Sequence, residues 1–224
     1  MAQALTPRMQ AMQDRLDDWP QLARYRADNA RLEPPRPAEA RVVFMGDSIT
    51  DLWGREVGEF FPGKPWVNRG ISGQTTPQML LRMRPDVIAL RPRVVVILAG
   101  TNDLAGNTGE SSLPEIEGHL TSMAELAHAN GIRVVFASLL PVHDAAHPVS
   151  ATRPHAQIVA LNTWIKTYAK HHGLVYLDYH TAMARPDGSL ERALSDDGLH
   201  PNAAGYKVMQ PLAQRAVEAA LAQR

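Results

Sequence analysis

Apolar residues in this chain form two kinds of run that alternate along the sequence. Some runs are short, nearly continuous and rich in β-branched residues, which is typical of strands buried on both faces. The strong strand candidates are Arg41–Gly46, Val94–Gly100 and Ile132–Ser138, and the weaker ones are Pro65–Asn68 and Leu174–Asp178. Apolar residues spaced three and four apart predict helices over Pro77–Leu90, Leu113–Asn130, His155–His172 and Asn202–Ala220.

The alternation of strands and helices predicts the fold class. A parallel sheet with helices on both faces is the arrangement that buries such segments. In folds of this kind, ligands bind in the crevice outside the carboxyl ends of the strands. We therefore expect an α/β fold whose functional residues lie at that edge.

The segment before the first strand has a separate pattern. Met9–Leu32 can form a helix interrupted near Pro20, and a proline-rich connector, Glu33–Pro37, follows it. Several apolar residues lie roughly on one side of this helix: Met12, Leu16, Trp19, Leu22 and Tyr25. We expect residues 1–40 to form a helical segment and connector, and residues 41–224 to form one domain. The segment is expected to dock on the flank of the domain or on a second subunit. Docking on a second subunit would make the protein a homo-oligomer. The alternative is that the segment forms a lid over the substrate.

Composition excludes several classes of protein. The 224 residues are 45% hydrophobic, which is enough for one substantial core. Lys and Arg together number 23, as do Asp and Glu, and no basic stripe appears, which argues against a nucleic-acid partner. The absence of cysteine excludes a disulfide, a thiolate metal site and a cysteine nucleophile. No apolar run approaches the roughly eighteen residues of a membrane-spanning helix.

The first residues leave the compartment open. Small residues in an A-x-A pattern often border signal-peptide cleavage sites, and Met1–Ala4 is similar to such a border. A periplasmic or secreted protein whose signal peptide was removed is one interpretation. A cytoplasmic protein that begins with these residues explains them equally well.

A serine follows the first predicted strand directly, in the run Gly46–Thr50. This spacing predicts that Ser48 stands at a strand-to-helix turn at the carboxyl edge of the sheet. The free N–H groups and the dipole of a helix N-terminus favour developing negative charge there. A plain helix N-cap is the alternative, because serine is among the best residues for that position.

A histidine and two aspartates lie together near the other end of the chain, in Ser195–Asn202. A serine hydroxyl needs an imidazole to accept its proton, and the imidazole needs a carboxylate to orient it. A single turn can place Asp197 beside His200 and leave the other ring nitrogen free to face Ser48. Asp196 is the competing carboxylate, and the spacing favours Asp197. The same residues also suit a turn that enters a helix at Pro201.

Two further strand ends offer donors for the oxyanion of a tetrahedral intermediate. Glycines in Asn68–Gly73 allow backbone and substrate to approach closely, and the Asn102 amide in Gly100–Asp103 can point inward. Separately, each segment is an ordinary turn. Together with Ser48 and His200, they fall at the same edge of the predicted sheet.

These segments resemble the four blocks of the SGNH, or GDSL, hydrolase superfamily, in order and at suitable separations. The blocks are Gly46-Asp47-Ser48, Gly70, Gly100–Asp103 and Asp197–His200. The resemblance spans roughly Arg41 to the C-terminus. The run Asn68–Thr76 is similar to the branch that contains platelet-activating-factor acetylhydrolases and bacterial acyl or acetyl esterases.

The resemblance implies a flavodoxin-like three-layer sandwich with a five-stranded parallel sheet, and a lipase-like esterase activity. It implies Ser48 as the nucleophile and Asp197 and His200 as the rest of a catalytic triad. It also implies an oxyanion hole made of the Ser48 N–H, the Gly70 N–H and the Asn102 side chain.

We therefore expect a serine-dependent carboxylic-ester hydrolase that acts on acetyl or short-chain acyl esters through an acyl-enzyme. Neither a cofactor nor a metal ion is expected. The neutral charge and the lack of an exposed hydrophobic helix favour small, soluble acetyl or short acyl esters. Alternatives are a lysophospholipase or thioesterase of the same fold and a non-catalytic flavodoxin-like binding module. The complete set of catalytic residue types argues against the module, and the chain lacks a phosphate-cradling run for a flavin.

A pair of histidines offers a weaker candidate site. His143 and His147 have a spacing that can bind zinc on a helix, but Pro141 and Pro148 bracket them as a loop. We expect this loop to form one wall of the substrate crevice.

Overall fold

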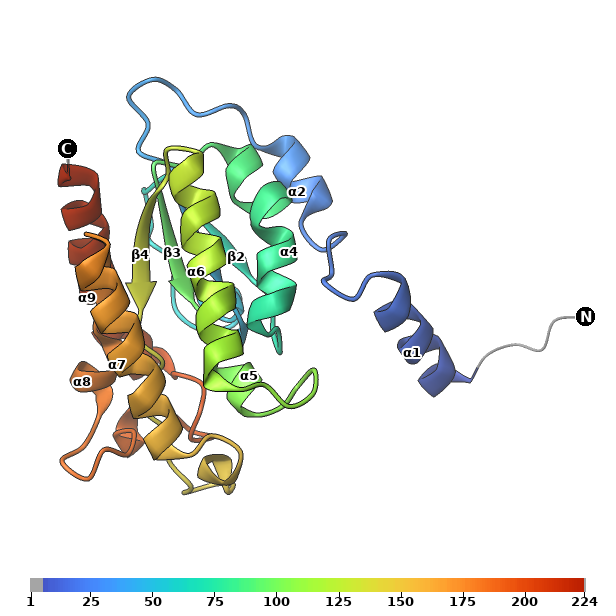
Figure 1. Cartoon of the computed structure of the whole chain (residues 1–224), viewed down its shortest axis with the longest axis vertical. Coiled ribbons are helices and arrows are strands. Elements are labelled where there is room, and N and C mark those ends of the chain that lie inside the picture. Colours follow the sequence, from blue (N-terminus) through green and yellow to red (C-terminus); the bar gives the residue numbers. More distant parts are fainter. Residues whose placement is uncertain (1–5, 224) are drawn as a thin grey trace, which may run out of the picture.

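The computed structural model describes residues 6–223, so the Met1–Ala4 pattern lies outside the described residues. A five-stranded parallel sheet, in the order β2-β1-β3-β4-β5, forms its middle layer (Figure 1). The strands are β1 (Val42–Gly46), β2 (Trp66–Gly70), β3 (Val94–Leu98), β4 (Arg133–Ala137) and β5 (Val175–Leu177). The two weakest sequence candidates are the edge strands β2 and β5, which are less buried than the central strands. This confirms the predicted three-layer α/β fold.

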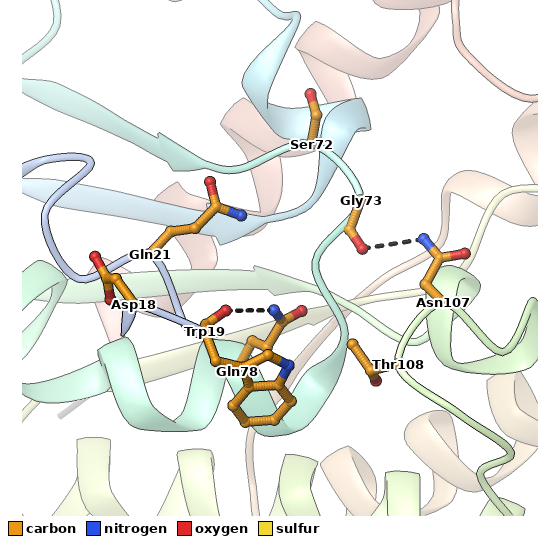
Figure 2. A pocket seen from close by; sticks show the side chains of 8 residues that line it. All are labelled: Asp18, Trp19, Gln21, Ser72, Gly73, Gln78, Asn107 and Thr108. Atoms are coloured by element: carbon orange, nitrogen blue, oxygen red, sulfur yellow. Dashed lines mark hydrogen bonds between the residues drawn. The ribbon is translucent and has the colours of Figure 1, made fainter. Parts of the chain in front are cut away.

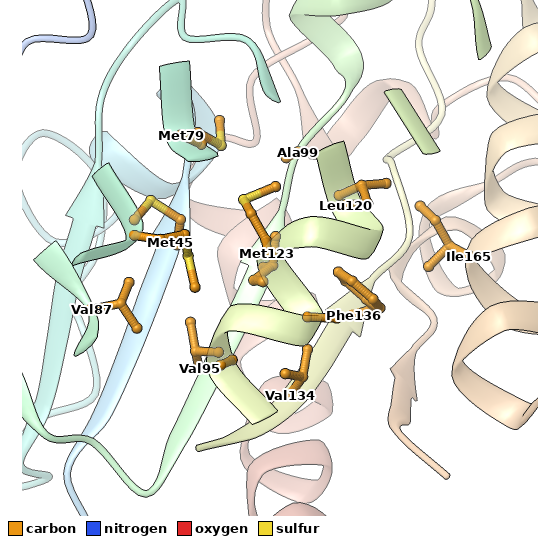
Figure 3. Close-up of a cluster of buried hydrophobic side chains, with 14 of the residues drawn as sticks. Met45, Met79, Val87, Val95, Ala99, Leu120, Met123, Val134, Phe136 and Ile165 are labelled. Atoms are coloured by element: carbon orange, nitrogen blue, oxygen red, sulfur yellow. The ribbon is translucent and has the colours of Figure 1, made fainter. Parts of the chain in front are cut away.

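Helices cover both faces of the sheet. One face is covered by α4 (Thr76–Asp86), α6 (Leu113–Ala129) and α7 (His155–His171), and the other by α3 (Ser48–Asp51), α8 (Tyr179–Met183) and α9 (Ala203–Ala222). Side chains of a strand alternate between faces, so Val43 and Met45 enter the first layer while Val42 and Phe44 enter the second. Both sets are buried, which explains why the strands are continuously apolar. Figure 3 shows the first of these cores.

The helix predicted over Pro77–Leu90 is shorter in the structure. A capping box made by Thr75 and Gln78 starts α4, which ends at Asp86. A separate 3₁₀ turn, η1 (Ile88–Leu90), follows. Pro85 lies in the last turn of α4, and the Val87 N–H still donates to the Met83 carbonyl at 3.2 Å before the backbone leaves the helical conformation at Val87, with φ of −126°.

The N-terminal segment is helical and interrupted near Pro20, as predicted, so it forms two helices. Helix α1 (Pro7–Asp17) extends away from the main body, whereas α2 (Arg26–Arg31) packs on α4 (Figure 1). The helix breaks because the Asp18 carboxylate accepts the Leu22 and Ala23 N–H groups, both at 2.8 Å. The backbone of Gln21 is left-handed, with φ of 55°.

The predicted single apolar side of this segment is wrong. Tyr25 is fully buried, and its hydroxyl donates to the Gly70 carbonyl. Met9, Met12 and Leu16 are instead 51–76% exposed. Helix α1 therefore exposes several apolar side chains, although most of its residues are polar. Among residues 6–223, no helix has the length and apolar character that a membrane crossing requires.

Candidate active site

Ser48 is the first residue of α3, directly after β1. The N-cap of this helix is Asp47, whose side chain accepts the Ile49 N–H at 2.9 Å. The interpretation of Ser48 as an N-cap is therefore wrong. The Tyr206 hydroxyl donates to the Ile49 carbonyl at 2.8 Å and links α3 to α9. The short helix that carries Ser48 is thus fixed from both its start and its side.

The structure brings Ser48, His200 and Asp197 into one line of contacts. His200 Nε2 lies 2.8 Å from Ser48 Oγ, and His200 Nδ1 lies 2.6 Å from Asp197 Oδ2. When Nδ1 carries a proton that Asp197 accepts, Nε2 is the nitrogen that accepts the hydroxyl proton. The competing carboxylate, Asp196, accepts from Asn202 Nδ2 at 3.1 Å at the entry of α9. Of the two aspartates, Asp197 is therefore the one beside the ring.

Hydrogen bonds from the His200 side chain and from two backbone N–H groups keep the Asp197 carboxylate ionised. Its Oδ1 accepts the N–H groups of Leu199 at 2.9 Å and His200 at 2.8 Å. Burial by itself raises the pKa of Asp197, but the hydrogen bonds from His200 and Leu199 outweigh it and bring that pKa well below its ordinary value. A permanent negative charge therefore faces the imidazole.

The structure does not support the oxyanion role expected for Gly70. Its N–H donates to Asn68 Oδ1 at 2.8 Å, so this donor is already occupied. A Cβ at Gly70 would lie 2.2 Å from the Asp51 nitrogen. Glycine is therefore required here so that β2 can pack closely against α3.

Gly73, three residues later, has the free N–H that Gly70 lacks. Ser72 donates to Asp51 Oδ2 from its N–H at 3.1 Å and its hydroxyl at 2.8 Å, and the Gln74 carbonyl accepts from Asn102 Nδ2 at 3.0 Å. Gly73 is thus held between the helix of Ser48 and the Asn102 amide. Within the described part of the chain, neither the Gly73 N–H nor the Ser48 N–H has a hydrogen-bond partner.

Arg153 is a further residue at the site, and the sequence gives no sign of it. Its guanidinium donates to Asn102 Oδ1 and to Thr101 Oγ1, both at 3.2 Å. The Asn102 oxygen is thereby occupied, which turns the amide nitrogen toward the Gln74 loop. Burial lowers the pKa of Arg153, while the charges of Asp47 and Asp197 raise it. Arg153 therefore brings positive charge to the same edge.

Asp47, the residue before Ser48, is a buried carboxyl. It is fully buried, and among residues 6–223 its Oδ2 has no hydrogen-bond partner. Burial raises the pKa of Asp47 to about 6, against the opposing effects of the Ile49 N–H and His200. The ionised form is therefore costly in the folded protein.

A pH-dependent effect of Asp47→Asn on stability should follow. Because the pKa of Asp47 is raised in the folded state, the contribution of Asp47 to the free energy of unfolding is fully present below about pH 4. This contribution is lost as the pH rises through about 6. The variant lacks this dependence. Its free energy of unfolding, relative to the parent, should rise by about 3 kcal/mol between about pH 4 and pH 8. Urea unfolding at several pH values measures the difference.

Asp144→Asn is a control of opposite sign. Hydrogen bonds from Ser150 lower the pKa of this exposed carboxyl. Relative to the parent, Asp144→Asn should lose stability as pH rises. Parallel pH curves for Asp47→Asn and the parent would contradict the assigned burial effect.

The loop that contains His143 supports the turn that carries Asp197. The His143 N–H donates to the Gly198 carbonyl at 3.0 Å, and its ring Nε2 lies 3.2 Å from the Ser195 carbonyl. Its Nδ1 accepts the Ala145 N–H at 3.1 Å. Both ring nitrogens are thus engaged, and residues 6–223 contain no group of three or more His, Cys, Asp or Glu able to hold a metal ion. The loop also borders a pocket of about 320 Å³.

Comparison with known proteins shows one matching family and several similar proteins. The model of the GDSL-like Lipase/Acylhydrolase family matches residues 44–208. A GDSL-like lipase from Bacteroides thetaiotaomicron is 41% identical with a TM-score of 0.84, covering 90% of this chain and 99% of that one. A candidate acylhydrolase from Bacteroides fragilis is also 41% identical, with a TM-score of 0.85 and coverage of 90% and 98%.

Among curated proteins, an acetylxylan esterase of Xylanibacter ruminicola is 26% identical over 220 residues. The match covers 82% of this chain and 44% of the relative. The chain spans about half the length of the curated relatives that it matches.

Proposed function

The chain belongs to the GDSL-like lipase/acylhydrolase family, and we propose that it is an ester hydrolase with Ser48 as its nucleophile, acting through an acyl-enzyme. The observation that carries this proposal is the line of contacts from Ser48 through His200 to Asp197, at 2.8 Å and 2.6 Å. The contact between Ser48 and His200 suits direct proton transfer, and the contact between His200 and Asp197 suits stabilisation of the charged imidazole. We also propose that residues 41–224 are the hydrolase domain, since the family match begins at residue 44.

The proposed reaction has two halves that share one base. Ser48 Oγ attacks the ester carbonyl while His200 Nε2 takes the hydroxyl proton, and the ionised Asp197 stabilises the imidazolium. The tetrahedral intermediate collapses when His200 gives that proton to the leaving alcohol oxygen, which breaks the C–O bond and leaves the acyl group on Ser48. Water then attacks the acyl carbonyl as His200 removes its proton. The second collapse returns the proton to Ser48 and releases the acid.

The proposed oxyanion hole consists of the Ser48 N–H, the Gly73 N–H and Asn102 Nδ2. Both backbone donors are unpaired in the described part of the chain, and Asn102 uses one amide hydrogen on Gln74, which leaves the other. Donors that are already oriented stabilise developing charge without reorganisation. Arg153 is proposed as a positioning residue, because it occupies the Asn102 oxygen and so fixes which end of the amide donates.

Acetyl or short-chain acyl esters are the proposed substrates. One curated relative is named an acetylxylan esterase, which favours an acetyl group. Long-chain substrates, as in a lysophospholipase, need an apolar groove for the chain. The pocket beside the Gly73 loop is instead lined mainly by polar side chains.

A chain-length series tests the proposed substrate class. We expect kcat/KM to be highest for p-nitrophenyl acetate and to fall at least roughly tenfold by the octanoate ester. Release of nitrophenol measures the rates, and mass spectrometry after organophosphate treatment locates the modified residue. A maximum at long chains would favour the lipase alternative, and no hydrolysis of any ester would overturn the proposal.

A further inference from the structure

A pocket of about 670 Å³ lies between the N-terminal segment and the loop that follows β2. Figure 2 shows the eight residues that line it, drawn from both parts of the chain. Trp19 and Gln21 form one side, and Gly73 and Asn107 form the opposite side. The size is within the range of about 300–1,000 Å³ that is usual for small-molecule sites.

Hydrogen bonds fix the N-terminal wall to the active-site loop. Gln78 Nε2 donates to the Trp19 carbonyl and Gln74 Nε2 donates to the Pro20 carbonyl, both at 2.7 Å. Gln74 also accepts, through its carbonyl, from Asn102. The wall of the pocket is therefore joined to the loop of the proposed oxyanion donors, and a substrate held in this pocket lies beside Gly73.

The lining favours a neutral ligand rich in hydroxyl groups. Trp19 is its one large apolar side chain, 41% exposed, and none of the eight lining residues is cationic. An acyl chain would bury the polar groups of the pocket without partners, which is costly. A phosphate headgroup would lack the Arg or Lys that most often bind such groups. The one charged residue, Asp18, already accepts two backbone N–H groups.

Polar groups in the pocket remain able to bind hydroxyls. Asn107 donates to the Gly73 carbonyl at 3.0 Å, which leaves its Oδ1 as an acceptor. The Gln21 amide has no partner among the described residues, and an amide can both donate and accept. An aromatic ring and amides that line one pocket match a sugar ring, which presents C–H groups on its faces and hydroxyls at its edge.

We propose that this pocket binds the glycosyl part of an acetylated sugar, with the Trp19 indole packed on a face of the ring and Gln21 and Asn107 bonding its hydroxyls. The N-terminal segment is then part of the substrate site, as a fixed wall. This inference rests on the proposed esterase function and deepens it, because it assigns the class of alcohol.

Substrate selectivity tests the assignment. The full chain and its variants are compared on acetylated xylotetraose and on p-nitrophenyl acetate, which has no sugar. Trp19→Ala should lower the ratio of the two kcat/KM values roughly tenfold, mainly through KM for the oligosaccharide. Trp19→Phe should restore most of the ratio, because it keeps an aromatic face. Gln21→Ala should lower the ratio by a smaller factor.

Leu22→Ala is the matched control. Leu22 is 37% exposed in the same segment but does not line the pocket, so its replacement should leave the ratio unchanged. A direct measurement complements the kinetics. Calorimetric titration of Ser48→Ala with acetylated xylotetraose should show binding that Trp19→Ala, added to it, weakens.

The outcomes separate this inference from the esterase proposal. Hydrolysis of p-nitrophenyl acetate without hydrolysis of acetylated xylotetraose overturns the sugar site and leaves the esterase. Equal loss on both substrates in Trp19→Ala also overturns the sugar site. If neither ester is hydrolysed, the esterase proposal fails, and the titration of Ser48→Ala still decides whether the pocket binds the oligosaccharide.

Discussion

Replacing Ser48 with alanine should reduce kcat for ester hydrolysis by a thousandfold or more, on the order seen when a nucleophile is removed. The substitution removes the attacking oxygen and its 2.8 Å contact with His200. Little packing changes, because only one small polar atom is lost from a side chain that is 8% exposed. Nitrophenol release measures kcat, and thermal unfolding followed by circular dichroism should show a nearly unchanged midpoint.

A serine elsewhere provides the control for this variant. Ser122 lies on α6, where its hydroxyl bonds the Gly118 carbonyl at 2.9 Å, and Ser122→Ala should retain parental activity. An organophosphate should add one adduct to the parent and to Ser122→Ala, and none to Ser48→Ala. Substantial turnover by Ser48→Ala would show that another group is the nucleophile.

Replacing Asp197 with asparagine should lower kcat by roughly a thousandfold to ten-thousandfold. The carboxylate that faces His200 Nδ1 at 2.6 Å is ionised, and an amide can neither stabilise the imidazolium nor hold the tautomer that leaves Nε2 free. The backbone bonds from Leu199 and His200 to Oδ1 need only an acceptor, which asparagine supplies. The loop should therefore keep its conformation while the chemistry fails.

The neighbouring aspartate is the internal comparison. Asp196 bonds Asn202 at the start of α9, so Asp196→Asn should change kcat by no more than a few-fold. Steady-state kinetics of the two variants, measured with the same ester, decide between the carboxylates. A severe defect in Asp196→Asn together with a nearly normal Asp197→Asn would mean that the assignment is reversed.

Sequence patterns predicted the fold well where burial is uniform. The central strands β1, β3 and β4 are buried on both faces, so their apolar runs are unbroken and unambiguous. The long helices α6, α7 and α9 each bury one face, which gives a clear period. Short helices such as α5 (Thr101–Leu104) and α8 contain too few residues to show a period, and the sequence did not predict them.

Site residues whose positions depend on a short stretch of chain could also be predicted from the sequence. Asp197 and His200 are three positions apart, so one turn decides their geometry. Ser48 follows β1 directly, and the strand end determines its edge of the sheet. The expectation for Gly70 failed because a glycine can serve more than one purpose at a strand end. The sequence around Gly70 does not distinguish a glycine needed for close packing against α3 from one that donates its N–H to an oxyanion.

Local burial and short spacings in the sequence were enough to predict the α/β class, the edge of the sheet that holds the site, and the serine, histidine and aspartate found there. Three features became visible only in the folded chain: which glycine has a free N–H, the bond from Arg153 to Asn102 across 51 positions, and the pocket that Trp19 and Gly73 both line. These contacts depend on the paths of loops that carry no periodic pattern. They form when distant polar groups find hydrogen-bond partners in the folded chain.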